Sequence, residues 1–288
     1  MILNWNKDNL SNLQNCTIDN LVIGFFDGIH KGHQKIFQNL TGKTCVLTFT
    51  DMVWKAPFLY PLEERIQQLE QLFYPEHILI FDVMQHNLTA QEFIEQYLQP
   101  LKINQIVVGA DFKFGKDQKG VEFLQQFYCV KVVSRDDEYA SSTIKKYLMQ
   151  AELQKANEML VIPYYRVGQV IHNFQISRAL NYPTANLRIN DKLVTLPDGV
   201  YITQTRLQES QYNSTTFIGI PKTFENITTK HFESFLIDYV GPEFYDETIR
   251  VTFFEWIDPV KKYPSVAELK SGIQKQVQQT NEYFKSRH

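Results

Sequence analysis

The sequence predicts an α/β protein of two domains, a parallel-sheet domain over residues 1–160 and an antiparallel β-barrel domain over residues 161–288. Up to about residue 160, short apolar runs rich in β-formers alternate with amphipathic helical segments, which is typical of a parallel sheet covered by helices. Beyond Pro163, such runs follow one another with only turns between them, which indicates an antiparallel sheet or barrel. Pro163 therefore marks the expected boundary.

The composition is that of a globular chain with room for a core. The 288 residues are 43% hydrophobic and 21% charged, and the net charge of −3 gives no reason to expect general nucleic-acid binding. No apolar run is long enough to span a membrane and no leader pattern is visible, so we expect a cytoplasmic protein without a membrane partner. The three scattered cysteines predict neither a disulfide framework nor a zinc site.

The first half is expected to alternate strands and helices. The expected strands comprise residues 21–26, 43–49, 77–83, 105–109 and 129–133. Pro61 suits the first turn of a helix, and Thr89 with Glu92 forms a capping box. The expected helices comprise residues 33–40, 62–73, a segment from Thr89 to about residue 98, and 141–159.

The second half is expected to be a barrel closed by one helix. The expected strands comprise residues 166–171, 199–205, 214–219, 232–239 and 249–256. Ser265 and Glu268 form a second capping box and begin the final helix. An apolar face of this helix is expected to cover the barrel, and it comprises Val266, Leu269, Ile273 and Val277.

The stretch with the most chemistry is residues 21–34. An apolar strand ends at the turn Asp27-Gly28, and His30 and His33 follow where a helix is expected to begin. A helix start offers backbone N–H groups to anions, and two imidazoles beside it add donors for phosphoryl oxygens. Gly28 and Gly32 allow a phosphate chain to approach the backbone closely.

This stretch resembles the signature of the HxGH nucleotidyltransferases, and within them that of bacterial bifunctional riboflavin kinase/FAD synthetase. The matching positions are Gly24, Phe26, Asp27, Gly28, His30, Gly32 and His33. The resemblance implies a Rossmann-like nucleotidyltransferase domain, followed by a flavokinase barrel with a C-terminal helix. It extends over most of the chain, because family motifs recur in both halves.

The other motifs add candidate site residues. Asp111 and Phe112 match the family's G-x-[DN]-F-x-F-G segment, and Ser142, Thr143 and Lys146 match its S-S-T-x-I-R segment. In the second half, Thr184 and Asn186 match the flavokinase P-T-A-N motif and Glu233 matches the E-x-H-x-x-D strand. Arg178 remains in the segment where the family binds the ATP of the kinase reaction.

The resemblance implies FAD biosynthesis: riboflavin is phosphorylated to FMN, and FMN is adenylylated to FAD, with ATP as substrate and Mg²⁺ as cofactor. His30 and His33 would donate hydrogen bonds during adenylyl transfer, and Glu233 would be the base of the kinase. Asp111 and Phe112 would contact flavin. Thr184 and Asn186 would hold Mg²⁺. The ATP and phosphate contacts would come from Gly24, Phe26, Asp27, Gly28, Gly32, Ser142, Thr143, Lys146 and Arg178.

The chain also departs from the family pattern. Met52 stands where the T-F-x-P-H-P segment has histidine, and Lys146 replaces an arginine. In the kinase loop, three positions where the family has glycine are occupied by Asn173, Ser177 and Asn181. Two alternatives therefore stay open: only the FMN adenylyltransferase site is active, or the chain is a non-catalytic flavin- or nucleotide-binding protein.

Overall fold

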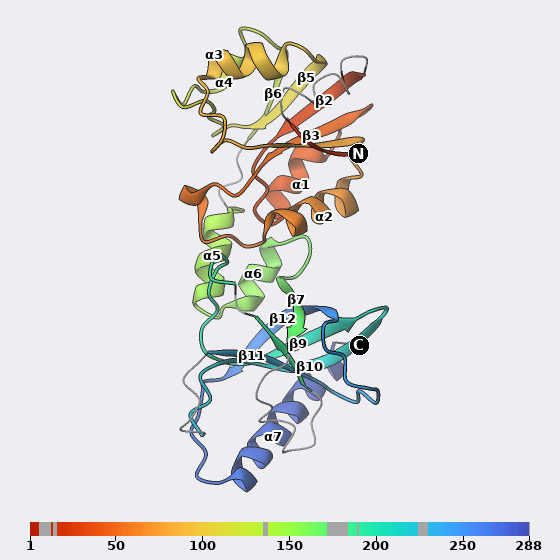
Figure 1. Cartoon of the computed structure of the whole chain (residues 1–288), viewed down its shortest axis with the longest axis vertical. Coiled ribbons are helices and arrows are strands. Elements are labelled where there is room, and N and C mark those ends of the chain that lie inside the picture. Colours follow the sequence, from red (N-terminus) through yellow and green to blue (C-terminus); the bar gives the residue numbers. More distant parts are fainter. Residues whose placement is uncertain are drawn as a thin grey trace. The chain divides into compact units, whose positions relative to one another are not determined.

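The computed structural model describes residues 1–5, 13, 16–134, 138–171, 184–188, 190–223 and 230–287. The chain divides into two compact units, Met1–Ser141 and Ser142–His288 (Figure 1). The second unit therefore includes residues 142–160, which the sequence analysis assigned to the first domain. The functional boundary at residue 160 stays a prediction.

The first unit is built on a six-stranded, wholly parallel sheet. In sheet order, its strands are β1 (Ile2–Asn4), β4 (His77–Phe81), β3 (Thr44–Phe49), β2 (Thr17–Ile23), β5 (Lys102–Gly109) and β6 (Val130–Val133). The five predicted strands are confirmed. Strand β1 was missed because its three residues are too few to show a strand period.

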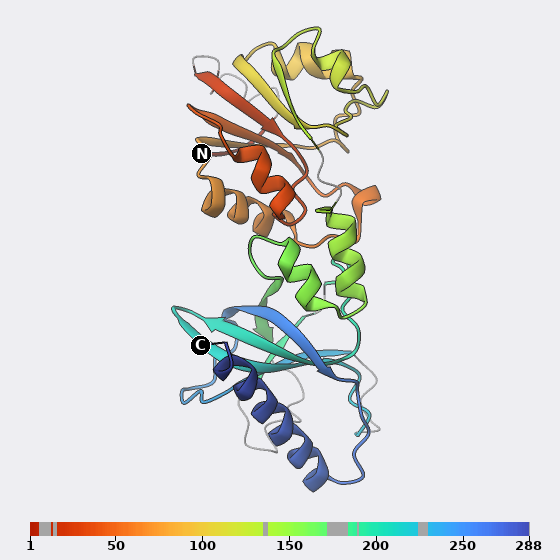
Figure 2. The same ribbon diagram turned by 180° about the vertical axis from the view of Figure 1, so that it is seen from behind.

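Helices cover both faces of this sheet (Figures 1 and 2). They are α1 (Lys31–Phe37), α2 (Leu62–Phe73), α3 (Ala90–Phe93), the π-helix η3 (Ile94–Leu98) and α4 (Val121–Leu124), with a 3₁₀ turn, η2 (Val53–Lys55). Leu21 and Ile23 share a core with α3, η3 and α4, whereas Val22 between them is buried on the opposite face. Burial on both faces explains why the central strands read as continuous apolar runs.

The single helix expected over residues 141–159 is wrong. The chain forms α5 (Ser141–Met149) and α6 (Leu153–Met159) instead. Ala151 is left-handed, with φ of 59°, and the amides of Ala151 and Glu152 bond to the carbonyls of Leu148 and Tyr147 at 3.1 and 2.9 Å. This hydrogen-bond pair is a Schellman motif that ends α5, and alanine in place of glycine hid it from the sequence analysis.

The second unit contains a closed barrel with antiparallel pairing. In barrel order, its strands are β10 (Ser210–Gly219), β11 (His231–Leu236), β8 (Thr184–Leu187), β7 (Tyr165–Ile171), β12 (Thr248–Asp258) and β9 (Gly199–Leu207). The sequence predicted all but β8, whose four residues follow a proline. The last helix, α7 (Val266–Lys285), packs against β9 and β10.

The apolar face predicted for α7 is partly wrong, because Val266 is exposed. The buried positions are Gln276, Thr280 and Phe284. The Thr280 hydroxyl lies 3.0 Å from that of Thr215 on β10, which explains why a polar residue is buried here.

Alternate residues of the barrel face its interior, where a hydroxyl network fills the space between β9, β10 and β11. All its members are fully buried and lie 2.7–3.0 Å from a neighbouring hydroxyl. They are Thr203, Thr205, Ser214, Thr216 and Ser234. Because neighbours in sequence alternate between faces, Thr215, Glu233 and Phe235 lie on the outer face.

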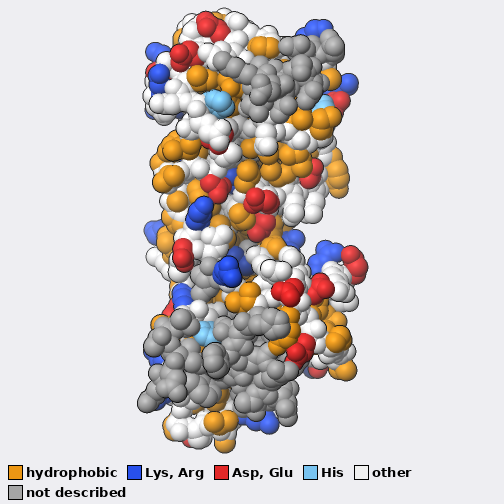
Figure 3. Space-filling view, in the orientation of Figure 1, with side chains coloured by type: hydrophobic (Ala, Val, Ile, Leu, Met, Phe, Trp, Pro, Cys, Tyr) orange, Lys and Arg blue, Asp and Glu red, His pale blue; other side chains and the backbone are white. Residues whose placement is uncertain are grey.

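Side chains of both signs are mixed on the face that Figure 3 shows. Among the helices in the described ranges, none combines the length and apolar character required to cross a bilayer.

Candidate active sites

The loop between β2 and α1 has an unusual backbone. Phe26 is left-handed, with φ of 55°, and is fully buried. Its ring lies against Gly24, where a Cβ would stand 2.7 Å from Cζ of Phe26. Gly24 is therefore required by this packing, and a strained bulky residue in such a loop is typical of a functional site.

The two histidines lie face to face at the end of this loop. Their rings are stacked with centroids 3.7 Å apart, and the edge of Phe26 packs on His33. The helix begins at Lys31, two residues earlier than the sequence suggested, and His30 is its N-cap, whose Nδ1 accepts the backbone N–H of His33 at 3.2 Å. Gly32 makes the close stacking possible, because a Cβ there would lie 3.0 Å from Nδ1 of His30.

The hydrogen bonds assign different tautomers to the neutral rings. Nδ1 of His30 is an acceptor, so the proton of that ring is on Nε2. Nδ1 of His33 lies 3.1 Å from the carbonyl of Gly28 and must donate to it, which leaves Nε2 of His33 without a proton. Burial lowers the pKa of His30 to about 4. Burial and the neighbouring His30 lower the pKa of His33 well below its usual range, so both rings are neutral at pH 7.

The loop is held from outside by α2 and the residues before it. Oδ1 of Asp27 accepts the amides of Leu59 and Tyr60 at 2.8 and 3.3 Å. The amide of Ile29 donates to Oε1 of Gln68 at 3.2 Å. The sequence analysis placed Asp27 among the phosphate contacts, but its Oδ1 is engaged in fixing the loop.

Two further anchors hold the loop at Phe25 and at Asp27. The carbonyl of Phe25 accepts Nη1 of Arg65 at 2.7 Å and the hydroxyl of Thr48 at 3.2 Å. The Ser141 hydroxyl donates to the carbonyl of Asp27 at 2.9 Å. Ser141 belongs to the predicted S-S-T segment, so this residue is a loop contact that the sequence analysis did not assign.

The other predicted residues of the adenylyl site lie on two elements, the turn after β5 and α5. Asp111 is exposed and Phe112 half-buried in the turn after β5, where Phe112 stacks on Phe114 with centroids 5.4 Å apart. Ser142, Thr143 and Lys146 lie on α5, with Ser142 and Lys146 exposed. Their predicted roles in binding flavin and phosphate stay predictions.

In the barrel, strand register brings the predicted kinase residues together. Glu233 on β11 is directly opposite Asn186 on β8, and Phe235 is opposite Thr184. Directly opposed residues of an antiparallel pair point to the same face, so Thr184, Asn186 and Glu233 share the outer face. The sequence motifs could not predict this arrangement, since β8 was not recognised as a strand.

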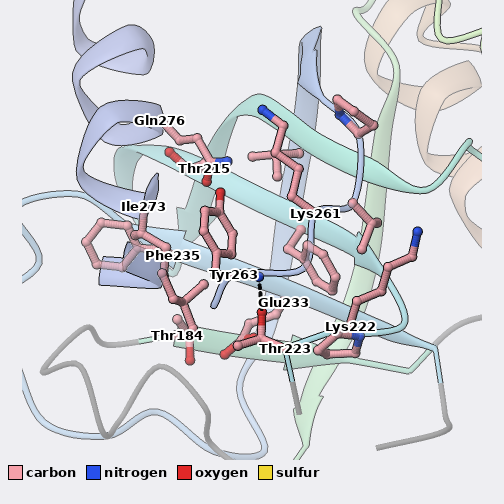
Figure 4. Close-up of a pocket in the computed structure, with 16 residues that line it drawn as sticks. Thr184, Thr215, Lys222, Thr223, Glu233, Phe235, Lys261, Tyr263, Ile273 and Gln276 are labelled. Atoms are coloured by element: carbon pink, nitrogen blue, oxygen red, sulfur yellow. Dashed lines mark hydrogen bonds between the residues drawn. The ribbon is translucent and has the colours of Figure 1, made fainter. Parts of the chain in front are cut away.

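Glu233 and Thr184 line an open pocket between the barrel and α7 (Figure 4). Its empty space, with the open mouth included, is about 880 Å³. Ile273 and Gln276 reach it from α7, and Phe217 and Phe235 provide aromatic surface from β10 and β11. The pocket can thus bury a flat apolar ligand beside a carboxylate.

The segment after β12 forms the other wall of the pocket. Asp258 is paired with Lys261 and accepts Nε2 of Gln276 at 3.1 Å, while the amide of Tyr263 donates to the Thr223 hydroxyl at 3.2 Å (Figure 4). The sequence analysis missed Thr223, Lys261 and Tyr263. No residue pattern marks them, because turns bring them to the pocket.

The donor set at β8 fits a hard divalent cation. Oδ1 of Asn186 is buried and has no hydrogen-bond partner among the described residues. An oxygen acceptor of this kind is compatible with a hard cation, and Thr184 is two residues away on the same face of β8. The described residues contain no group of three His, Cys, Asp or Glu that could hold a metal alone. Arg178, Asn173, Ser177 and Asn181 lie outside the described residues.

Comparisons with known proteins cover both units. The family model of FAD synthetase matches residues 13–143, and that of riboflavin kinase matches residues 160–284. The Bifunctional riboflavin kinase/FMN adenylyltransferase of Mycoplasma pneumoniae is 34% identical over 267 residues, which are 92% of this chain and 97% of that protein. The corresponding protein of Bacillus subtilis is 29% identical, with 92% of each covered.

Two other similarities involve proteins of different names. The Trifunctional protein RibF/MnmA of Mycoplasmoides gallisepticum is 37% identical over 254 residues, which are 88% of this chain but only 38% of that longer protein. The crystal structure of a macrolide-efflux protein from Streptococcus pneumoniae has a TM-score of 0.83 at 27% identity and covers 98% of both chains. The likeness to this structure extends over both units.

Proposed function

This chain belongs to the family of bacterial bifunctional riboflavin kinase/FMN adenylyltransferases, and we propose from that premise which residues carry the two reactions. The enzyme phosphorylates riboflavin to FMN and adenylylates FMN to FAD, with ATP as the donor in both steps. The observation that supports the assignment best is the stacked pair of His30 and His33 beside a loop that six hydrogen bonds hold in place.

In the adenylyl step, an oxygen of the FMN phosphate bonds to the α-phosphorus of ATP and the bond to pyrophosphate breaks. No protein nucleophile is needed, so the site acts by positioning and by neutralising charge on the phosphoryl oxygens. His30 is the donor in its neutral form, through Nε2–H. His33 donates from Nε2 only after it gains a proton, which a bound polyanion favours.

In the kinase step, the 5′-hydroxyl oxygen of riboflavin bonds to the γ-phosphorus of ATP, and ADP leaves. Glu233 takes the hydroxyl proton as general base. The apolar wall of the pocket, with Phe217 and Phe235, would hold the flavin ring.

Mg²⁺ would be held at β8 by Asn186 and Thr184 together with phosphate oxygens, and it would neutralise charge on the transferred phosphoryl group. Asp111, Phe112, Ser142, Thr143, Lys146 and Arg178 keep their proposed contacts to flavin and phosphate. We place the enzyme in the cytoplasm, where ATP is supplied.

Labelled ATP tests this function directly. The purified chain is incubated with riboflavin and Mg²⁺, and products are separated by chromatography. Of the flavin products, FMN and FAD should both carry label from the γ-phosphate, and FAD alone should carry label from the α-phosphate. Formation of FMN without FAD, or of neither, would refute the two-step assignment.

A further inference from the structure

Arg65 is a charged residue of α2 that is completely enclosed by the protein. Its Nη1 donates to the carbonyl of Phe25 at 2.7 Å, and its Nη2 donates to the carbonyl of Phe49 at 3.1 Å and to Oδ1 of Asp51 at 3.0 Å. The guanidinium also lies over the Phe25 ring, 4.1 Å from its centroid. One side chain therefore ties the loop after β2 to the end of β3.

Stability alone is a poor reason for this arrangement. A buried ion pair is costly to desolvate, and apolar residues of the same volume are often equally stabilising or more so. The planar fork of arginine, however, fixes three acceptors at once, which neither an apolar side chain nor a lysine can do. The arrangement thus favours a role in precise placement.

The anchored carbonyl is only a few residues before the proposed catalytic histidines in the sequence. Phe25 precedes the left-handed Phe26, and the carbonyl of Gly28 that orients His33 is three residues beyond Phe25. A shift of the Phe25 carbonyl would therefore be passed to Gly28 and to the histidine stack.

The partner of Arg65 lies in the segment where this chain departs from the family motif. Asp51 precedes Met52, which stands at the position of the absent histidine. The Asp51 carboxylate is partly exposed, and it opposes the effect of burial on Arg65, which lowers the pKa of the guanidinium. Asp51 thereby stabilises the charge of Arg65 and fixes the direction of its Nη2.

We propose that Arg65 and Asp51 are a positioning pair for adenylyl transfer, and this proposal rests on the function proposed for the first unit. Neither residue touches the reacting atoms. They act by holding the loop of residues 24–30 so that His30 and His33 meet the phosphoryl oxygens.

The test compares both activities of the same full-length chain in Arg65→Met, Arg65→Lys and Asp51→Asn. In Arg65→Met, kcat for FAD formation from FMN should fall about 10²-fold, because a displacement of about 1 Å costs that much. KM for ATP and FMN should change by less than about threefold, since the loss concerns the transition state. In Arg65→Lys, kcat for FAD formation should fall about tenfold, because lysine keeps the charge but lacks the planar fork of donors. In Asp51→Asn, the same kcat should fall about threefold.

FMN formation from riboflavin is the internal control and should stay within about twofold in each variant. Glu76→Gln is the matched control for Asp51→Asn, because Glu76 forms an exposed pair with Lys43 in the same unit, and it should leave both activities unchanged. Thermal unfolding shows which variants are folded, and if Arg65→Met is not, the Arg65→Lys and Asp51→Asn variants decide.

Folded Arg65 variants with wild-type kcat for FAD formation would overturn the proposal. So would a parallel fall of both activities together with the unfolding temperature, which indicates a structural role only. A wild-type chain that makes no FAD would instead refute the proposed function itself.

Discussion

In the first unit the proposed catalytic histidines lie where a loop meets α1, with His30 as the N-cap and His33 in the first turn, whereas in the second unit Glu233 and Asn186 lie on paired strands. The loop between β2 and α1 is held by side chains that lie outside it, Arg65 and Gln68 of α2 among them. In the barrel, the register of β8 and β11 alone sets the two side chains side by side. The comparison teaches that side chains placed by a loop depend on supporting residues far from the motif in sequence. Side chains placed by paired strands need few supporting residues outside the strands.

The largest effect is expected from Glu233→Gln. The loss of a general base should lower FMN formation by about 10³-fold, whereas FAD formation from added FMN should not change. Flavin binding should persist, because the aromatic walls of the pocket remain, and fluorescence titration with riboflavin measures it. A Glu233→Gln chain with near wild-type kinase activity would remove Glu233 from the role of base.

Replacement of His30 or His33 by Ala should lower FAD formation from FMN by about 10²-fold or more, the scale of losing a transition-state donor. FMN formation should hardly change, because these residues belong to the other site. Initial rates with FMN and ATP, followed by chromatography, measure the effect. If the double variant makes FAD at the wild-type rate, the histidine pair is not the adenylyl site.

A smaller effect is expected from a change of pH, and it concerns the free energy of unfolding. His30 has its pKa lowered to about 4 in the fold but an ordinary value of about 6.5 when unfolded, so the unfolded chain binds more protons between these values. Above pH 6.5 the free energy of unfolding is not reduced by this burial. As the pH falls towards 4, the free energy of unfolding decreases by up to about 3 kcal/mol.

Denaturant unfolding at pH 7.5 and pH 5 measures this loss, and His30→Gln should reduce it. Part of the pH dependence should remain, because the pKa values of His33 and His77 are lowered as well. An unchanged pH dependence in His30→Gln would show that His30 is not buried as a neutral ring.

The same comparison explains what the sequence could predict. Most strands of both units, though not the short β1, and the closeness of His30 to His33 follow from local patterns, because apolar runs and motif spacing are local. Strand β8 and the break at Ala151 escaped, since four residues after a proline and an alanine in a left-handed cap carry no clear signal.

Arg65 was missed although the sequence contained a sign of it. It is three residues after Leu62 and four before Leu69, so it falls on the apolar stripe of α2. A charge on such a stripe indicates a buried partner, but only the fold identifies that partner as the carbonyl of Phe25. The pocket residues Thr223 and Tyr263 could not be found at all, because tertiary turns bring them together.

The central claim is that one chain carries two separate active sites, and mixing two inactivated chains tests it most directly. Each variant alone should form FAD from riboflavin at least about 10²-fold more slowly than the wild type, Glu233→Gln because it makes little FMN and His30→Ala/His33→Ala because FMN accumulates. The mixture of the two, with riboflavin, ATP and Mg²⁺, should form FAD much faster than either alone, because FMN released by one chain is the substrate of the other. A wild-type rate of FAD formation from riboflavin in either variant alone, or a mixture no faster than the variants alone, would contradict the account.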